Sequence, residues 1–302
     1  MSGMTAAPPS PQFVTAIGGI NEVRGRDPQR ISRLLASRRR RSLFGGDGKL
    51  MIVACDHPAR GALGAGGNPT AMASRTELLE RLLTALSRPG VHGLLGTADI
   101  AEDLLLLGAL EDKLVFTSMN RGGLQGASFE IDDRNTGYDV QGTIESGFEG
   151  AKMLLRVDLS DPATVATLEQ CGRAITELNR ARLIAMVEPF MAGRRGSKLV
   201  NDLSPEAVIK SVHIAQGLGA SSAYTWLKLP VVPEMERVMD ATTLPTLLLG
   251  GDPEDVPDET YASWEAALKL PSVRGLVAGR TMLYPADDDV AKAVDTAVSL
   301  VR

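Results

Sequence analysis

Short apolar segments rich in β-branched and aliphatic residues alternate with helical patterns from residue 49 onward. This alternation is typical of βα units arranged around a parallel sheet. Eight segments have the character of strands, at residues 49–55, 91–96, 113–118, 151–157, 183–187, 224–229, 246–249 and 275–278. Eight strands that are each followed by a helix favour an α/β fold of the (β/α)8 TIM-barrel type over an open doubly wound sheet, which is the alternative.

The helical segments between these strands begin with recognisable capping patterns. Ser74 is followed three residues later by Glu77, as in a capping box, and Ser204 precedes a proline in the first turn of another helix. Asp161, which also precedes a proline, is expected to open the helix after the fourth strand. These starts support the alternation of strands and helices.

Residues 1–45 lie outside the eightfold pattern and form an N-terminal extension, whereas residues 46–302 are expected to form one catalytic barrel domain. The extension contains a predicted helix that starts at Asp27 and ends in the arginine run 38–41. Such a run suits RNA binding, but this one has no interleaved aromatic residues. We therefore favour a solvated helix end or a subunit contact.

Composition narrows the class of protein. The 302 residues are 44% hydrophobic and 23% charged, as in a globular protein with a sizeable core, and the net charge of −5 argues against a nucleic-acid partner. The two cysteines, Cys55 and Cys171, give no disulfide framework. No segment has the length of a membrane span, and the first 13 residues lack a hydrophobic signal region. We expect a cytoplasmic homo-oligomer without a membrane partner.

Lys228 is the first candidate for chemistry, because it lies in an apolar and aromatic segment between Tyr224 and Pro230. Burial disfavours the charged form of an amine and so makes it a nucleophile at neutral pH. The alternative is a lysine that extends its amine to the rim of the barrel or pairs with a carboxylate. The placement of the strand within an eightfold pattern favours the catalytic interpretation.

Other charged residues occur at the ends of the predicted strands, where the active site of a barrel enzyme lies. Asp56 ends the first strand, Lys152 lies in the fourth and Glu188 ends the fifth. Alternation places each of them on the same face of its strand as apolar residues that would fill the barrel. If that face is the interior, two lysines and two carboxylates meet in one pocket. The alternative is a structural cluster of ion pairs.

The seventh and eighth predicted strands end in glycines, which let backbone amides approach an anion. Gly250 and Gly251 follow the seventh strand, and Gly279 and Arg280 follow the eighth. A phosphate commonly binds between these two loops of a barrel, at the start of a short helix that residues 281–284 would form. We therefore predict a phosphate site there.

Three further residues are candidate substrate ligands. Arg121 lies in a long loop, 119–139, of the kind that forms lids, and its planar guanidinium suits a phosphate or carboxylate. A surface loop with its charges in solvent is the alternative. Arg156 lies on the same face of the fourth strand as Lys152, and His57 follows Asp56 at the expected pocket mouth.

No cofactor is predicted from the sequence. The other histidines, His92 and His213, fall in positions that suit structural roles, and neither HExxH, HxH nor CxxC spacing occurs. A dinucleotide fingerprint and a phosphate-binding loop of the Walker type are also missing from the sequence. We expect a reaction that needs neither a metal ion nor a nucleotide cofactor.

Several short motifs, in order along the chain, resemble those of class I (Schiff-base) aldolases. The superfamily groups deoxyribose-phosphate aldolase, tagatose-1,6-bisphosphate aldolase and the archaeal-type fructose-bisphosphate aldolases. The matching runs are DHPARGAL at 56–63, TGYD at 136–139, GAKMLL at 150–155, VEP at 187–189, WLKLP at 226–230 and GLVAGR at 275–280. Within this superfamily the chain most resembles a bacterial group of aldolase-like barrels associated with inositol catabolism.

The resemblance implies that Lys228 forms the Schiff base and that Glu188, Asp56 and Lys152 complete the catalytic set. It also implies a phosphorylated keto-sugar or keto-sugar acid as substrate, with 5-dehydro-2-deoxy-6-phosphogluconate as one example. Two features depart from the tagatose branch: Arg156 replaces an aromatic residue, and the loop that carries Arg121 is longer. Additional cations suit a substrate with a carboxylate or a second anionic group.

The hypothesis is therefore a metal-independent retro-aldol lyase. Deoxyribose-phosphate, tagatose-bisphosphate or fructose-bisphosphate aldolase activity is an alternative within the same chemistry. A sugar-phosphate isomerase, epimerase or binding barrel would retain the glycine loops but would not need Lys228. A non-catalytic sugar-phosphate sensor would bind the ligand without forming product.

Overall fold

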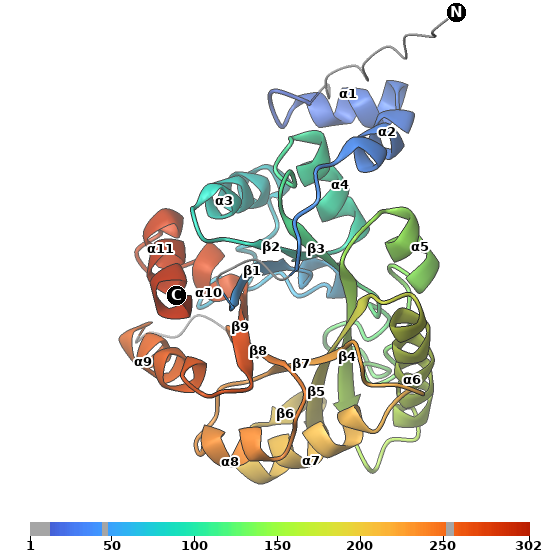
Figure 1. Ribbon diagram of the computed structural model, residues 1–302, viewed down its shortest axis with the longest axis vertical. Coiled ribbons are helices and arrows are strands. Elements are labelled where there is room, and N and C mark those ends of the chain that lie inside the picture. The colour runs from blue at the N-terminus through green and yellow to red at the C-terminus, as the bar shows by residue number, and fades with distance from the viewer. Residues whose placement is uncertain (1–12, 44–47, 252–256) are drawn as a thin grey trace, which may run out of the picture.

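The structure is a computed structural model that describes residues 13–43, 48–251 and 257–302 (Figure 1). Eight parallel strands close into a barrel, because β4 pairs with β3 on one side and with β5 on the other. These strands are β1 (Leu50–Cys55), β2 (Gly93–Gly96), β3 (Leu114–Ser118), β4 (Gly150–Val157), β5 (Ile184–Arg195), β7 (Thr225–Leu229), β8 (Thr246–Leu249) and β9 (Val273–Ala278). The predicted (β/α)8 barrel is confirmed.

A helix follows each barrel strand and lies on the outside of the barrel (Figure 1). These helices are α3 (Arg75–Ser87), α4 (Ala98–Leu106), α5 (Val140–Glu145), α6 (Thr164–Arg180), α7 (Pro205–Gln216), α8 (Met235–Asp240), α9 (Pro257–Leu268) and α11 (Val290–Val301). Two of the predicted caps are confirmed, since Ser74 Oγ accepts a hydrogen bond from the Glu77 amide and Ser204 Oγ accepts one from the Ala207 amide. The prediction that Asp161 opens α6 was wrong, because the helix is preceded by Ala163, whose amide donates to Asp161 Oδ1. None of the helices in the described ranges combines the length and the apolar character that a membrane span requires.

Two short helical turns complete the C-terminal side of the barrel. A 3-10 turn, η1 (Pro58–Arg60), follows β1, and α10 (Arg280–Leu283) follows β9. The second turn begins one residue earlier than expected from the sequence. Both turns lie directly after the strand ends that carry candidate site residues, so they fix where the chain leaves the barrel.

The barrel interior is filled by apolar side chains that alternate along the strands. They form one cluster, made by Leu50, Ile52, Ala54, Leu95, Leu114, Phe116, Ile184, Met186, Trp226, Leu247 and Val277. These include the positions that the period-two pattern assigned to the face shared with Asp56, Glu188 and Lys228. Because the apolar layers occupy the lower and middle parts of the barrel, the charged residues one step further along each strand lie above them.

The fifth strand is longer than predicted and forms a hairpin. It was expected to end at residue 187, but β5 continues to Arg195 and pairs antiparallel with β6 (Lys198–Asp202). Pro189, which lacks an amide donor, made a longer strand improbable from the sequence. The signal for the hairpin was its turn, in which Gly196 has a φ of +63° that glycine tolerates.

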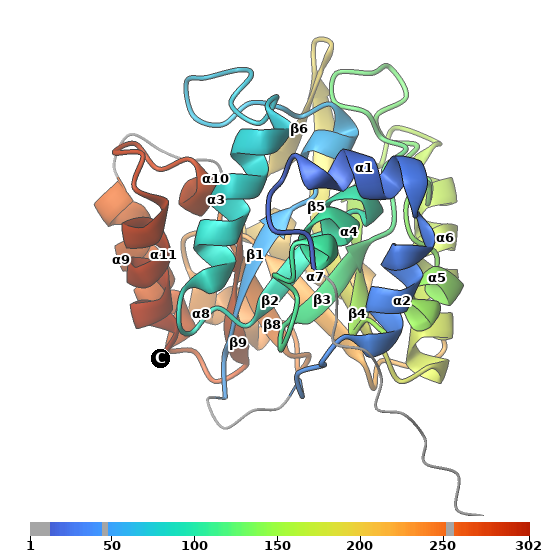
Figure 2. The same cartoon turned by 90° about the horizontal axis from the view of Figure 1, so that it is seen from above.

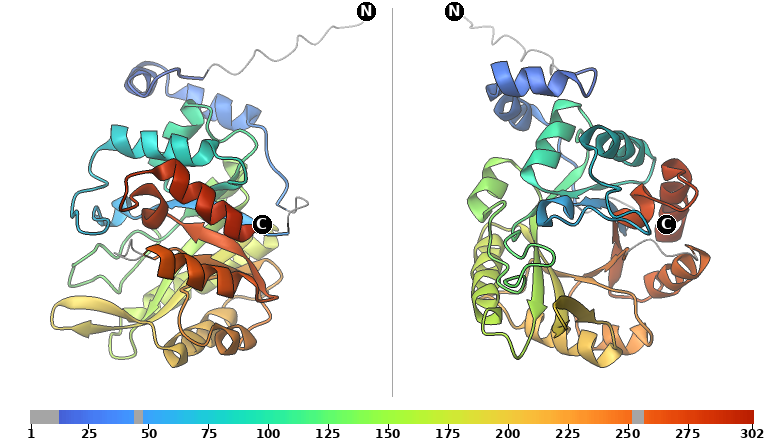
Figure 3. Two further views of the ribbon diagram at one scale, coloured as in Figure 1. Left: turned by 90° about the vertical axis from the view of Figure 1, so that its left-hand side faces the viewer. Right: turned by 180° about the vertical axis from the view of Figure 1, so that it is seen from behind.

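Two helices precede the barrel, where one was expected. α1 (Gly19–Arg26) comes before α2 (Gln29–Ser37), and α2 packs against α4 on one side of the barrel (Figures 1 and 3). The Arg24 guanidinium joins α1 to Asp103 of α4 at 2.8 Å. The domain boundary expected at residue 45 lies outside the described residues.

The arginine run 38–41 directly follows α2 and is only partly solvated: the side chains of Arg39 and Arg40 are exposed, whereas that of Arg38 is buried. The Arg38 side chain is 1% exposed and donates hydrogen bonds to the carbonyl oxygens of Lys113 and Gly147. It also forms an ion pair of 3.1 Å with Glu149, which Arg40 contacts at 3.0 Å. The run therefore attaches the N-terminal extension to the side of the barrel where the strands begin.

Candidate active site

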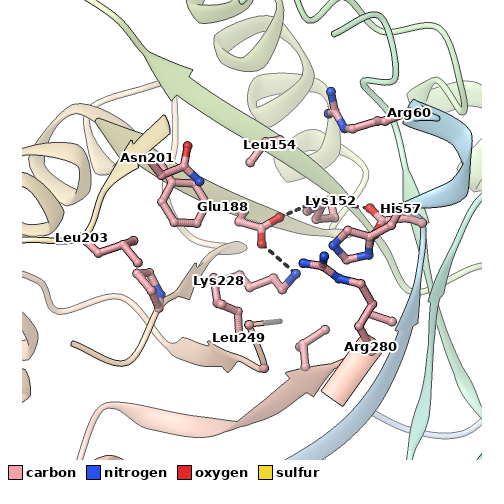
Figure 4. A pocket seen from close by; sticks show the side chains of 18 of the residues that line it. His57, Arg60, Lys152, Leu154, Glu188, Asn201, Leu203, Lys228, Leu249 and Arg280 are labelled. Carbon is pink, nitrogen blue, oxygen red and sulfur yellow. Dashed lines mark hydrogen bonds and ion pairs between the residues drawn. The ribbon is translucent and has the colours of Figure 1, made fainter. Parts of the chain in front are cut away.

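A cavity of about 350 Å³ opens at the C-terminal ends of the barrel strands. Its charged lining comes from residues far apart in the sequence, which the barrel brings together (Figure 4). These residues are Asp56, Arg60, Arg121, Lys152, Glu188, Lys228 and Arg280, and His57 lies among them. The sequence predicted six of these eight as catalytic residues or substrate ligands near a strand end, and placed Arg121 in a loop; Arg60 was not predicted.

Strand geometry explains how the charged side chains reach the cavity. Lys228 in β7 follows Trp226 by two residues, and Glu188 in β5 follows Met186 by two. Alternation places both charged side chains on the interior face, one layer above the apolar cluster. Lys228 is only 3% exposed, so its amine lies inside the cavity rather than in bulk solvent.

An alternating chain of charges runs across the floor of the cavity. The Lys228 Nζ donates a hydrogen bond of 2.8 Å to Glu188 Oε1, and the other Glu188 oxygen contacts the Lys152 Nζ. The Lys152 Nζ also donates to Asp56 Oδ2 at 3.2 Å. One carboxylate therefore lies between two amines, and one amine between two carboxylates (Figure 4). Pairing of Lys228 with a carboxylate was also expected from a structural role, so the pair alone does not distinguish the two interpretations.

Asp56 is held by more than Lys152. Its Oδ2 accepts a hydrogen bond of 2.8 Å from the Ser118 hydroxyl and lies 3.2 Å from a guanidinium nitrogen of Arg121. Burial raises the pKa of Asp56, but the charges of Lys152 and Arg121 outweigh it and hold the pKa well below its usual range. Asp56 is therefore ionised at neutral pH.

Burial and neighbouring charges also compete in setting the pKa values of Glu188 and Lys152. Burial raises the pKa of Glu188, whereas Lys152 and Lys228 lower it by more, to about 2. Burial lowers the pKa of Lys152, and the positive charges of Lys228 and Arg121 add to that effect. Three basic side chains, those of Lys152, Lys228 and Arg121, thus share two carboxylates, and Arg280 also lines the cavity, so the cavity suits an anionic substrate.

His57 lies at the mouth of the cavity, with its Nδ1 3.7 Å from Asp56 Oδ1. Its environment lowers its pKa, chiefly through burial, and the charges of Arg280 and Lys228 act in the same direction. The ring retains 32% of its surface exposure, which moderates the shift but leaves the imidazole neutral at pH 7. A neutral imidazole can donate one hydrogen bond to a substrate and accept one from it.

The predicted phosphate loops lie together at one side of the cavity, where Gly250, Gly251, Gly279 and Arg280 all contribute to its lining. Packing requires glycine at two of these positions. A Cβ at Gly279 would lie 2.3 Å from the Ala54 carbonyl oxygen, and a Cβ at Gly250 would lie 2.5 Å from the Ala278 Cβ. The glycines therefore allow the strand ends to approach closely, which is a sufficient reason for them without a bound anion.

The two arginines expected to bind substrate differ in position. Arg121 lines the cavity, but its guanidinium also donates to the Asp56 carbonyl oxygen at 2.5 Å. Arg156 is not among the lining residues, because it forms an ion pair of 2.6 Å with Glu130 and donates to the Glu130 carbonyl. The structure therefore brings Arg121 but not Arg156 to the cavity lining, and the role of each in substrate binding stays a prediction.

The loop 119–139 is not a surface lid with its charges in solvent. Glu130 and Asp133 are buried, and Asp133 forms an ion pair with Arg60. Arg60 also donates to the carbonyl oxygens of Asn120 and Gly123. These contacts close the loop over the side of the cavity next to β1 and β4.

Sequence reasoning missed the residues that the β5–β6 hairpin contributes to the cavity. Phe190, Asn201 and Leu203 line it, and Asn201 and Leu203 lie on the side opposite Arg280 (Figure 4). Asn201 pairs through its backbone with Ala192, two residues beyond Phe190. The turn at Gly196 and Ser197 was the signal that would have revealed them. In the described part of the chain, no cluster of three or more His, Cys, Asp or Glu side chains has an arrangement suited to a metal ion.

Comparison with known proteins gives one close family match and several matches of fold. A family model described as Cgl0159-like matches residues 48–298. The chain is 57% identical to Cgl0159 from Corynebacterium glutamicum (Brevibacterium flavum), whose crystal structure it matches with a TM-score of 0.93 over 98% of both chains. No curated protein sequence matches the chain.

Among the solved structures with lower identity are four fructose-bisphosphate aldolases. One is a Schiff-base-forming fructose-1,6-bisphosphate aldolase, with 18% identity and a TM-score of 0.63 over 90% of this chain and 100% of that one. Another is an archaeal fructose-1,6-bisphosphate aldolase whose catalytic lysine carries the carbinolamine intermediate, with 17% identity and a TM-score of 0.62 over 90% and 99% of the two chains. At these identities the likeness establishes a shared aldolase-like fold.

Proposed function

This chain belongs to the Cgl0159-like family, and from that premise we propose that it is a class I aldolase. In this proposal Lys228 forms a Schiff base with a phosphorylated keto-sugar or keto-sugar acid, and the enzyme cleaves a carbon-carbon bond without a metal ion. The proposal rests on one observation: the amines of Lys228 and Lys152 both contact the Glu188 carboxylate inside the cavity.

The shared carboxylate supports a nucleophilic role for Lys228. An amine attacks a carbonyl only in its uncharged form, so it must first give up a proton. Glu188 lies 2.8 Å from the Lys228 Nζ and is the nearest acceptor, and Lys152 contacts the other oxygen of the same carboxylate. The three groups together provide a route for that proton within the site.

The reaction would then proceed in balanced steps. The uncharged Lys228 nitrogen adds to the substrate ketone, and loss of water from the carbinolamine gives an iminium ion. A base removes the proton of the hydroxyl on the carbon beyond the bond to be broken, the bond's electron pair moves to the iminium nitrogen, and an aldehyde leaves. Protonation of the remaining enamine and hydrolysis release the second product and restore Lys228.

Glu188 and Asp56 are our candidates for the proton transfers. Glu188 would serve carbinolamine formation or accept the proton of the reacting hydroxyl, and Asp56 would orient substrate hydroxyls or share the role of base. Lys152 contacts both carboxylates. In the proposal it holds a substrate hydroxyl and tunes the reactivity of the Lys228 amine. His57, as a neutral ring at the cavity mouth, would bind a substrate oxygen.

The substrate phosphate would bind beside Lys228, where Gly250, Gly251 and Gly279 bring backbone close to Arg280. An anion held there would fix the ketone over the lysine nitrogen, which converts binding energy into orientation. The excess of basic over acidic side chains in the cavity lining gives a positive potential, which supports an anionic substrate in general. Arg121, whose guanidinium contacts Asp56, would contribute to this positive potential.

The resemblance to aldolase-like barrels of inositol catabolism makes 5-dehydro-2-deoxy-6-phosphogluconate our first choice of substrate. Deoxyribose-phosphate, tagatose-bisphosphate and fructose-bisphosphate cleavage remain alternatives that use the same lysine. An isomerase or a sugar-phosphate-binding barrel would use the same cavity but would not need Lys228 as a nucleophile.

Borohydride trapping tests the proposal directly. Reduction of the enzyme in the presence of these substrates should leave a stable adduct on Lys228 that mass spectrometry of peptides locates. Lys198, an exposed lysine on the hairpin, provides an internal reference for non-specific labelling. Turnover of a substrate without any adduct on Lys228 would contradict the mechanism.

A further inference from the structure

The β5–β6 hairpin stands above the C-terminal end of the barrel (Figure 2). Its first strand is the continuation of β5, which carries Glu188, and its second strand, β6, returns across the mouth of the cavity. Asn201 of β6 and the following Leu203 thereby enter the cavity lining together with Phe190 of β5. None of the three residues of this wall is among the catalytic residues proposed above.

The side chain of Asn201 forms no hydrogen bond with any residue that the structure describes. An asparagine amide offers two donors and one acceptor oxygen, and at the wall of a polar cavity these groups are available to a ligand. Figure 4 shows Asn201 on the opposite side of Lys228 from Arg280. Asn201 is therefore placed to contact the part of a substrate that extends away from the phosphate loops.

The two sides of the cavity differ in charge. Arg280, His57 and Lys152 lie toward one side, whereas the hairpin side presents the Leu203 side chain and the Asn201 amide (Figure 4). Phe190, from the strand that forms the hairpin, also lines the cavity. The hairpin does carry cations, but none of those described lines the cavity. Arg194, for example, donates to the Ser128 carbonyl oxygen of the loop 119–139 at 2.5 Å.

We propose that Asn201 determines substrate specificity by binding a hydroxyl or carboxyl oxygen at the end of the substrate remote from the phosphate. This inference rests on the proposed aldolase function and narrows its substrate class to keto-sugar monophosphates. A second phosphoryl group at that end is disfavoured, because a dianion against Phe190 and Leu203 loses water without gaining a cation. A site that hydrogen-bonds one group and leaves another unpaired discriminates between them.

Four ligands separate the parts of this proposal. Fructose 1-phosphate and fructose 1,6-bisphosphate differ only in the remote phosphoryl group, and 5-dehydro-2-deoxy-6-phosphogluconate has a remote carboxyl. Dihydroxyacetone phosphate contains the ketone and the phosphate but is too short to reach the hairpin. Dissociation constants would be measured by calorimetry in a Lys228→Met background, in which no cleavage consumes the ligand.

Asn201→Ala is the test variant, and Lys198→Ala is its control, because Lys198 lies on the opposite face of the same short strand and is exposed. We expect Asn201→Ala to weaken binding of fructose 1-phosphate or of the carboxyl-ended ligand by about 5-fold, the effect of one lost hydrogen bond. Binding of dihydroxyacetone phosphate should not change, and Lys198→Ala should change none of the four constants. Which of the two longer ligands responds identifies the remote group as hydroxyl or carboxyl.

Two results would overturn the inference. One is tighter binding of fructose 1,6-bisphosphate than of both monophosphates to the protein with Asn201 intact. The other is an Asn201→Ala variant that binds every ligand as before. Failure of the aldolase proposal looks different, because Lys228 of the unaltered protein would then lack a borohydride adduct while the binding differences at Asn201 persist.

Discussion

The Glu188 carboxylate accepts a hydrogen bond of 2.8 Å from the Lys228 amine, at a point in the barrel where both side chains are buried. A buried pair of this kind is stable only when each charge finds a partner. Lys152 completes the arrangement on the other oxygen of the carboxylate. Changes to any one of the three residues should therefore affect both catalysis and folding.

Glu188→Gln tests the catalytic part of this relationship. The amide has the shape of the carboxylate but cannot accept a proton, so kcat should fall by about 10²- to 10⁴-fold, the usual contribution of a general acid or base. Steady-state kinetics and the rate of borohydride trapping measure the effect. Glu206→Gln, a change at an exposed glutamate of α7, is the control. An unchanged kcat in Glu188→Gln would remove Glu188 from the mechanism.

The low pKa of Glu188 predicts how stability depends on pH. The folded-state pKa of about 2 lies below the unfolded value of about 4.3, so the folded protein is stabilised above about pH 4.3 and loses this contribution as the pH falls toward 2. Asp56, whose pKa is also lowered, acts in the same direction. Urea unfolding between about pH 6 and pH 2.5 should show a steep loss of stability.

The same measurement in Glu188→Gln should give a shallower decline over that range, because one of the two titrating carboxylates is missing. An identical pH profile for both proteins would show that the pKa of Glu188 is not shifted by folding. The free energy of unfolding at neutral pH should also be lower in the variant, since two buried amines lose a partner.

Arg38 is predicted to stabilise the attachment of the N-terminal helices to the barrel. Its replacement in Arg38→Ala removes a buried ion pair with Glu149, so the free energy of unfolding should fall by about 3–5 kcal/mol. Arg39→Ala is the matched control: its side chain is 63% exposed and pairs with Asp112, so its loss should leave the free energy of unfolding almost unchanged. Equal effects in the two variants would contradict a structural role specific to Arg38.

Treatment with a chelator should leave aldolase activity unchanged, because in the proposed mechanism the iminium ion at Lys228 accepts the electron pair of the broken bond. The measurement is the initial rate after dialysis against EDTA. Loss of activity that added zinc or another divalent ion restores would point to a different electrophile.

Strand periodicity was sufficient to predict the centre of the site. Asp56, Glu188 and Lys228 each follow, at intervals of two, apolar residues of the interior cluster, whereas the residues between them pack outward against the helices. Their convergence therefore followed from pattern and topology together. The contacts among them, such as that of Lys152 with both carboxylates, needed coordinates.

Long-range partners explain what the sequence did not reveal. Arg156 has the spacing of a pocket residue, but Glu130 from the loop 119–139 holds it outside the cavity lining. No local pattern indicates which carboxylate of a long loop reaches a given arginine. The hairpin was missed because Pro189 interrupts the strand signal, and with it Asn201 was missed. The division at residue 45, the homo-oligomer and the cytoplasmic location stay predictions.

The hairpin has one more consequence for the enzyme. A single uninterrupted strand, β5, holds Glu188 near its middle and Phe190 two residues later, before the chain turns back toward Asn201. Any tilt of the hairpin that a larger ligand imposes must therefore pass through the backbone of Glu188, the proposed proton acceptor. A wrong substrate would be slowed twice, once by poor fit and once by a misaligned carboxylate.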